Sequence, residues 1–97
     1  MSLAEFKMDD NVAVVTLNSG ENRFNPEFLD AFLNILDEVE NNKDANVLIV
    51  QSAHEKIFSN GIDLDWLLPY VQNKDIDTCK AFFYKLNDLF KRVLMYP

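Results

Sequence analysis

Two apolar runs at the start of the chain predict a β-hairpin. Glu5–Met8 and Asn11–Leu17 flank Asp9-Asp10, two residues of a type that favours turns. The second run is rich in valine, is almost continuously apolar over 12–15 and stops at Asn18-Ser19-Gly20. Continuous apolar character is typical of a strand with little solvent on either face. We therefore expect a hairpin whose second strand is buried on both sides.

The next segment has helical periodicity and predicts an amphipathic helix of about four turns. Asn25 can accept from an exposed N–H, Pro26 presets φ, and Glu27 complements the positive end of the helix dipole. The apolar face comprises Phe28, Leu29, Phe32, Leu33, Leu36 and Val39, and the solvated face carries Asp30, Asp37, Glu38 and Glu40. After the polar stretch 41–44, we expect Val47–Val50 to form a buried strand joined by a right-handed crossover.

Two further helices are predicted. The first, Leu64–Val71, is expected to be short, irregular and interrupted by Pro69, and a loop over 72–74 follows it. Asp75 then caps a longer helix with an apolar stripe of about 30 Å. The stripe comprises Ile76, Cys79, Phe82, Phe83, Leu86, Leu89, Phe90, Val93 and Leu94, and Lys80, Lys85, Lys91 and Arg92 are expected on the solvated face. Left exposed, a stripe of this width favours association, whereas Cys79 is interpreted as a small core residue.

Composition narrows the class of protein. With 97 residues the chain is one small domain at most, and its formal net charge of −7 argues against nucleic-acid binding, which needs a basic patch. A single cysteine and the lack of a signal-like N-terminus favour a reducing, cytoplasmic compartment. No apolar run approaches the ~20 residues of a membrane span. We interpret residues 1–3 in part as a cloning remnant.

The segment Phe58–Trp66 holds the most informative motif. Ser59, Asn60 and Gly61 favour a turn between the apolar strand and the next helix, and Asp63 and Asp65 suit that helix's first turn. Backbone N–H groups at such a terminus are donors that can stabilise an oxyanion forming on a carbonyl. His54 lies nearby, but one histidine without clustered ligands makes a poor metal site, so no metal is predicted.

Four segments in order resemble the crotonase family, also called the enoyl-CoA hydratase/isomerase family. They are Asn11–Asn18, Glu21–Phe28, Val47–Val50 and the turn Phe58–Leu64. The resemblance implies an α/β fold, the crotonase-like (ClpP/crotonase) spiral of strand-strand-helix units, of which residues 1–97 are expected to form only the N-terminal part. The run Phe58–Leu64 with Trp66 resembles plant-type Δ3,Δ2-enoyl-CoA isomerases somewhat more than hydratases.

The resemblance also implies a site. The N–H of Ile62, the residue after Gly61, would be one of two donors to the thioester oxygen of an acyl-CoA. Coenzyme A would lie against Asn22, Arg23 and Phe24 and against Asn60, Gly61, Ile62, Asp63 and Leu64, with Arg23 as the phosphate contact. Asp65 departs from the family, which often has a basic residue there. Trp66, Leu67 and Leu68 are expected to line the acyl pocket.

The implied activity is that of an enoyl-CoA hydratase or a Δ3,Δ2-enoyl-CoA isomerase acting on fatty acyl-CoA thioesters through a stabilised enolate. No cofactor is expected beyond the coenzyme A of the substrate, and family members are usually trimers or hexamers. The family's catalytic carboxylates have no counterpart here, so the chain alone is expected to be inactive. An alternative is a small acidic, non-catalytic interaction module that uses the apolar stripe of the C-terminal helix.

Overall fold

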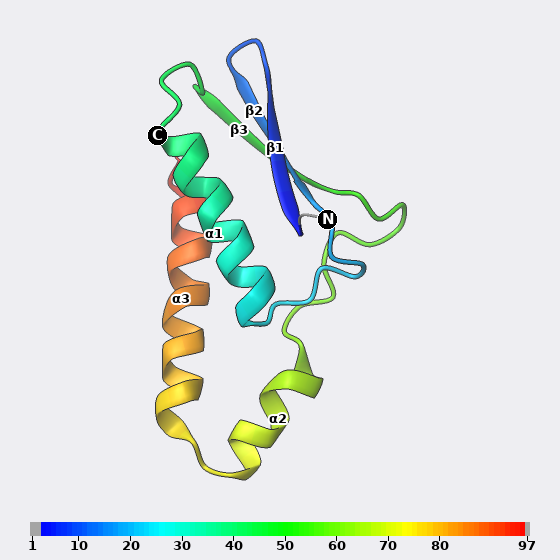
Figure 1. Ribbon diagram of the computed structural model, residues 1–97, viewed down its shortest axis with the longest axis vertical. Coiled ribbons are helices and arrows are strands. Elements are labelled where there is room, and N and C mark those ends of the chain that lie inside the picture. Colours follow the sequence, from blue (N-terminus) through cyan, green and yellow to red (C-terminus); the bar gives the residue numbers. More distant parts are fainter. Residues whose placement is uncertain (1–2, 97) are drawn as a thin grey trace.

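The chain forms a three-stranded sheet and three helices (Figure 1). The computed structural model describes residues 3–96, so Met1 and Ser2, where a cloning remnant was predicted, lie outside the described residues. The elements in order are β1 (Ala4–Asp9), β2 (Val12–Leu17), α1 (Pro26–Glu40), β3 (Val47–Ser52), α2 (Leu64–Gln72) and α3 (Ile76–Leu94).

The predicted hairpin and crossover are both present. β1 pairs antiparallel with β2, and Phe6 lies opposite Val15. β3 pairs parallel with the other edge of β2, where Val15 lies opposite Val50. The sheet order is therefore β1-β2-β3, and α1 provides the crossover between the two parallel strands.

The sheet is buried on only one face, which corrects the prediction for β2 and β3. In β2, Ala13, Val15 and Leu17 are buried, but Val12 and Val14, which alternate with them along the strand, are only partly so. In β3, Val47 and Ile49 are 49% and 47% exposed. The physical reason is that α1 covers one face, while nothing within residues 3–96 covers the other. β3 is also an edge strand of the sheet.

Helix α1 matches its prediction at both its start and its apolar face. The Asn25 side chain accepts from the Phe28 N–H at 2.9 Å, and Pro26 is the first helical residue. α1 lies between the sheet and α3 (Figure 1). Its apolar side chains therefore form the centre of the core, with Phe28, Leu29, Phe32, Leu36 and Val39 buried and Leu33 packed at the edge.

Five charged side chains on α1 and α3 form ion pairs between the two helices. Lys85 binds Asp30 at 2.6 Å. Arg92 binds both Asp37, at 2.7 Å, and Glu40, at 3.1 Å. The hydrogen bonds that Arg92 donates to these carboxylates, the one to Glu40 above all, raise the pKa of its guanidinium. These pairs join the two helices along the edge of their interface.

Two helix predictions need correction. α2 is not interrupted at Pro69, because one missing N–H at an exposed position leaves the later bonds intact: the Asn73 N–H still donates to the Pro69 carbonyl at 3.0 Å. The stripe of α3 is buried only at Phe82, Leu86 and Leu89. Cys79 is only partly buried, so it is not the small core residue that was predicted, since α1 meets α3 along one side only.

The molecule is elongated, with extents of 48 × 27 × 21 Å. Its radius of gyration is 14.4 Å, against about 12.5 Å for a compact domain of this length. The α2–α3 arm produces much of this extension (Figure 1). Across the part of the chain that the structure describes, no helix is both long and apolar enough to span a bilayer.

Candidate oxyanion-binding turn

Two segments that the sequence singled out meet in an isolated parallel bridge between Phe24 and Ile62. The Phe24 N–H donates to the Gly61 carbonyl at 2.7 Å, and the Asp63 N–H donates to the Phe24 carbonyl at 2.8 Å. One residue earlier along the turn, the Asn60 N–H donates to the Glu21 carbonyl at 2.9 Å. The two predicted coenzyme-binding segments, 22–24 and 60–64, are therefore one structural unit.

This bridge sets the direction of the Ile62 N–H. Along an extended segment, backbone groups alternate in direction, and Gly61 and Asp63 use theirs to bind Phe24. The Ile62 N–H accordingly points away from Phe24. Among the hydrogen bonds formed within residues 3–96, none has this N–H as its donor.

The turn before Ile62 depends on Gly61. Its φ of +78° lies in the left-handed region that residues with a Cβ rarely adopt. The hydroxyl of Ser59 supports the turn, since it accepts from the Gly61 N–H at 3.1 Å and donates to the Asn22 carbonyl at 2.7 Å. Helix α2, nine residues long, starts two residues after Ile62. A donor with no acceptor among the described residues thus lies beside the positive end of a helix dipole, which suits a carbonyl oxygen that gains negative charge.

Asn22 is a structural centre that sequence reasoning did not identify. Its side chain is fully buried, accepts from the Ser19 N–H, and donates to the Ser52 hydroxyl and the Phe58 carbonyl, each at 2.8 Å. A φ of +54° places it where asparagine is among the few tolerated residues. Asn22 therefore holds the end of β3 and the turn in place, and its side chain offers no surface to a ligand.

Charges surround the turn without blocking it. Arg23, the predicted phosphate contact, is half-exposed and binds Glu21 at 2.9 Å. Glu21 also accepts from the Asn60 amide at 2.9 Å. The pKa of Asp63 is lowered, first by the hydrogen bond from the Asn25 amide and then by the Trp66 N–H and the Arg23 charge, although partial burial opposes the shift. Asp63 therefore remains a carboxylate at neutral pH.

His54 has a local structural role. Its Nδ1 accepts from the N–H groups of Lys56 and Ile57 at 3.0 and 3.1 Å, which shapes the loop after β3. Within residues 3–96 no three histidine, cysteine, aspartate or glutamate side chains gather in a way that could hold a metal ion.

The three residues predicted to line an acyl pocket have different surroundings within residues 3–96. Leu67 is buried and Leu68 is exposed. Trp66 packs at a tilt against Tyr70 and Phe82, with interplanar angles of 43° and 49°, and lines a cavity of about 260 Å³ beside α1. Consecutive residues of a helix point in different directions, about 100° apart, so these three side chains have different neighbours, and the acyl pocket stays a prediction.

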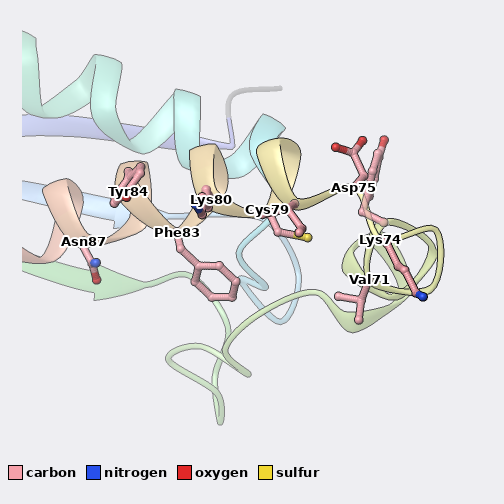
Figure 2. A pocket seen from close by; sticks show the side chains of 10 residues that line it. Val71, Lys74, Asp75, Cys79, Lys80, Phe83, Tyr84 and Asn87 are labelled. Carbon is pink, nitrogen blue, oxygen red and sulfur yellow. The ribbon is translucent and has the colours of Figure 1, made fainter.

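A larger apolar groove of about 440 Å³ lies instead where α2 meets α3. Figure 2 shows Phe83 and Cys79 on one side of α3, with Val71 and Lys74 near the end of α2. The remaining lining residues are Tyr70, Asp75, Ile76, Lys80, Tyr84 and Asn87. The consecutive run 66–68 gave no signal of this groove, because its lining comes from the end of α2 and from residues spaced along α3.

The hairpin, crossover helix and donor-bearing turn define the class of protein: an α/β segment with the crotonase-like fold. The chain belongs to the enoyl-CoA hydratase/isomerase family, whose model matches residues 7–95. The match corresponds to the N-terminal portion of that family. This agrees with the resemblance seen in the sequence.

Among curated proteins, the chain is similar to "Enoyl-CoA delta isomerase 2, peroxisomal" and "Enoyl-CoA delta isomerase 3", both of Arabidopsis thaliana. Identities are 30% and 28% over 60 residues, or 62% of this chain. The chain spans about a quarter of the length of these relatives, since the matches cover 25% of each.

Solved structures support the fold. An enoyl-CoA hydratase from Shewanella pealeana has a TM-score of 0.80 at 21% identity, with 93% of this chain and 34% of that chain covered. An enoyl-CoA hydratase from Thermoplasma volcanium has a TM-score of 0.81 at 21% identity, with coverage of 95% and 36%. An enoyl-CoA isomerase from Mtb has a TM-score of 0.80 at 22% identity, with coverage of 99% and 39%.

Proposed function

We propose that this chain forms the thioester-binding part of an enoyl-CoA isomerase or hydratase active site, with the Ile62 N–H as one of two donors to the thioester carbonyl oxygen. The observation that carries the proposal is the Ile62 N–H, which donates to no group within residues 3–96 and is held between Gly61 and Asp63 by the bridge to Phe24. Family membership supports the substrate class, and the two plant relatives favour isomerase over hydratase.

The chemistry proposed for this donor is enolate stabilisation. When a proton leaves the carbon beside a thioester, negative charge moves onto the carbonyl oxygen. A fixed N–H aimed at that oxygen stabilises the charge without reorganising, and loss of one such donor typically costs ~10² to 10³ in rate. The second donor and the carboxylate that moves the proton are proposed to come from outside this chain, so the chain alone is expected to bind rather than catalyse.

Coenzyme A is proposed to approach along segments 22–24 and 60–64. Arg23 is the proposed phosphate contact, because its guanidinium is half-exposed and lies on the bridged unit that holds the donor. The pairing with Glu21 must be shared or released when phosphate binds, which lowers the gain from this contact. Asp65, on the first turn of α2, adds negative charge nearby and disfavours a phosphate at that position.

A titration of the ¹⁵N-labelled chain with butanoyl-CoA tests the proposal, since this thioester has the carbonyl but does not react. We expect the Ile62 amide resonance to shift with added ligand until the site is saturated, and the fluorescence of Trp66, the chain's only tryptophan, to change with it. Free coenzyme A is the control because it lacks the carbonyl. Shifts confined to other residues, or equal shifts with free coenzyme A, would contradict the assigned donor.

The two glycines give a matched pair of variants. Gly20 and Gly61 both have positive φ, +56° and +78°, and a Cβ at either meets no atom within 4 Å. Gly20→Val and Gly61→Val should therefore cost similar stability through backbone strain, about 1 to 2 kcal/mol. Only Gly61→Val should remove the Ile62 response to butanoyl-CoA. In the assembled enzyme it should lower turnover by ~10² to 10³.

The exposed stripe of α3 supports a second candidate, the non-catalytic interaction module. Ile76, Phe83, Phe90 and Leu94 remain exposed, and the groove beside α2 is predominantly apolar. Such a surface favours a protein partner. In this case the chain should not bind butanoyl-CoA, and it should bind a protein partner through α3. In the leading proposal, the assembled enzyme is expected to sediment as a trimer or hexamer.

A further inference from the structure

The N-termini of two helices are joined by one hydrogen bond between their capping side chains. Asn25 caps α1 with its Oδ1, which accepts from the Phe28 N–H at 2.9 Å. Asp63 caps α2 with its Oδ1, which accepts from the Trp66 N–H at 3.3 Å. The remaining atoms of the two caps then bind each other, since the Asn25 Nδ2 donates to the Asp63 Oδ2 at 3.0 Å.

This hydrogen bond joins the residues that directly follow the two bridged residues, so it lies next to the proposed donor. Asn25 follows Phe24 and Asp63 follows Ile62, so the side-chain bond continues the backbone bonds that hold the donor. The Ile62 N–H is thus placed between the left-handed Gly61 and a residue tied to α1. Any movement of the start of α2 relative to α1 must stretch the Asn25–Asp63 bond.

The two helices differ in how firmly the rest of the molecule holds them. α1 has five buried side chains and lies against the sheet and α3. α2 has one, Leu67, with Trp66 packed against Phe82. A helix with so little buried apolar surface needs other anchors to keep a fixed position. The hydrogen bond from Asn25 supplies such an anchor at the N-terminus of α2, next to the Ile62 donor.

We propose that Asn25 and Asp63 are positioning residues: their hydrogen bond transfers the fixed position of α1 to the start of α2 and thereby orients the Ile62 N–H. The inference rests on the proposed function, in which that N–H meets the thioester oxygen. The lowered pKa of Asp63 agrees with a carboxylate held by the Asn25 amide. Neither residue touches the reacting atoms in this scheme.

Exchanging the two residues tests the proposal without removing either cap, because asparagine and aspartate are equally good N-caps. Asn25→Asp leaves two carboxylates facing each other with no donor between them. The exchange variant, Asn25→Asp with Asp63→Asn, restores one amide and one carboxylate with the donor on the α2 side. Asp63→Asn alone retains a donor and should fall between these extremes.

We expect Asn25→Asp to displace the Ile62 amide resonance of the unliganded chain and to raise the half-saturating butanoyl-CoA concentration about tenfold. The exchange variant should return both quantities toward those of the unchanged protein. Residues that merely stabilise the fold would not show this recovery in binding. If Asn25→Asp fails to fold, Asp63→Asn and the exchange variant carry the test, and the exchange variant should bind butanoyl-CoA more tightly than Asp63→Asn.

Three results would overturn the inference: an Ile62 resonance that Asn25→Asp does not move, an exchange variant that shows no recovery, or one that fails to fold together with Asn25→Asp. The proposed function fails separately. If the Ile62 resonance moves in Asn25→Asp and returns in the exchange variant, while no form of the chain responds to butanoyl-CoA, the positioning role stands and the thioester site does not.

Discussion

Helices α1 and α3 begin from similar sequence patterns and end in different environments. Both have an aspartate or asparagine cap and an apolar stripe at three- and four-residue spacing. α1, with 15 residues, buries five of them between the sheet and α3, whereas α3, with 19 residues, buries three. Periodicity therefore identifies which face of a helix is apolar. It does not say how much of that face will find a partner.

The largest expected difference in the free energy of unfolding comes from truncating one phenylalanine to alanine in each helix. Phe28 on α1 is fully buried and packs near Phe24 and Phe32, whereas Phe83 on α3 is 40% exposed. Phe28→Ala should lower the free energy of unfolding by about 3 to 5 kcal/mol, enough to unfold much of a marginal domain. Phe83→Ala should cost below about 1 kcal/mol.

Urea denaturation followed by circular dichroism measures both variants. The predicted outcome is a large fall in the urea midpoint for Phe28→Ala and a small one for Phe83→Ala. Equal losses would mean that α3 is buried as deeply as α1 in solution, for instance against another molecule. Repeating the titration at a second protein concentration separates that case, since association makes the midpoint depend on concentration.

A smaller change in the free energy of unfolding is expected from removing the charges that join α1 and α3. Arg92 is mostly buried by its neighbours and binds two carboxylates of α1, whereas Lys85 is half-exposed and binds one. Arg92→Met should cost about 1 kcal/mol of unfolding free energy, and Lys85→Met below about 0.5 kcal/mol. Added salt should narrow the difference by screening. A larger loss for Lys85→Met would show that α3 is held at a different point along α1.

Local patterns gave most of the fold, and long-range pairing accounts for what they missed. The hairpin and the caps Asn25 and Asp75 depend on a few neighbouring residues, so the sequence alone can predict them. Asp63 was expected in the first turn of α2 and is instead its N-cap. The solvent exposure of β3 depends on what covers the outer face of the sheet. The sequence of residues 47–50 does not indicate whether another element covers this face.

The candidate site divides in the same way. The family resemblance placed Gly61 and Ile62 in a donor-bearing turn, and the described structure contains such a turn. The partners of Asn22 at Ser52 and Phe58 lie 30 and 36 residues away, and the Asn25–Asp63 bond spans 38. A polar side chain that finds a partner at such a distance leaves no periodic signal, so the supports of the site became visible only with the fold.

The smallest effect on stability, but a direct test of the exposed stripe, is expected from Phe83→Lys. Phe83 lines the groove between α2 and α3, and a charge there should weaken self-association, because a buried lysine would lose its hydration at the contact. Asn34→Lys, at an exposed position on α1, adds one positive charge elsewhere and is the control.

Sedimentation velocity over a range of concentrations should show Phe83→Lys shifted toward monomer, while Asn34→Lys sediments like the unchanged chain. If both variants shift equally toward monomer, net charge rather than the stripe governs association. If the unchanged chain associates and neither variant shifts, the contact lies elsewhere. The exposed outer face of β3 is then the next surface to mutate.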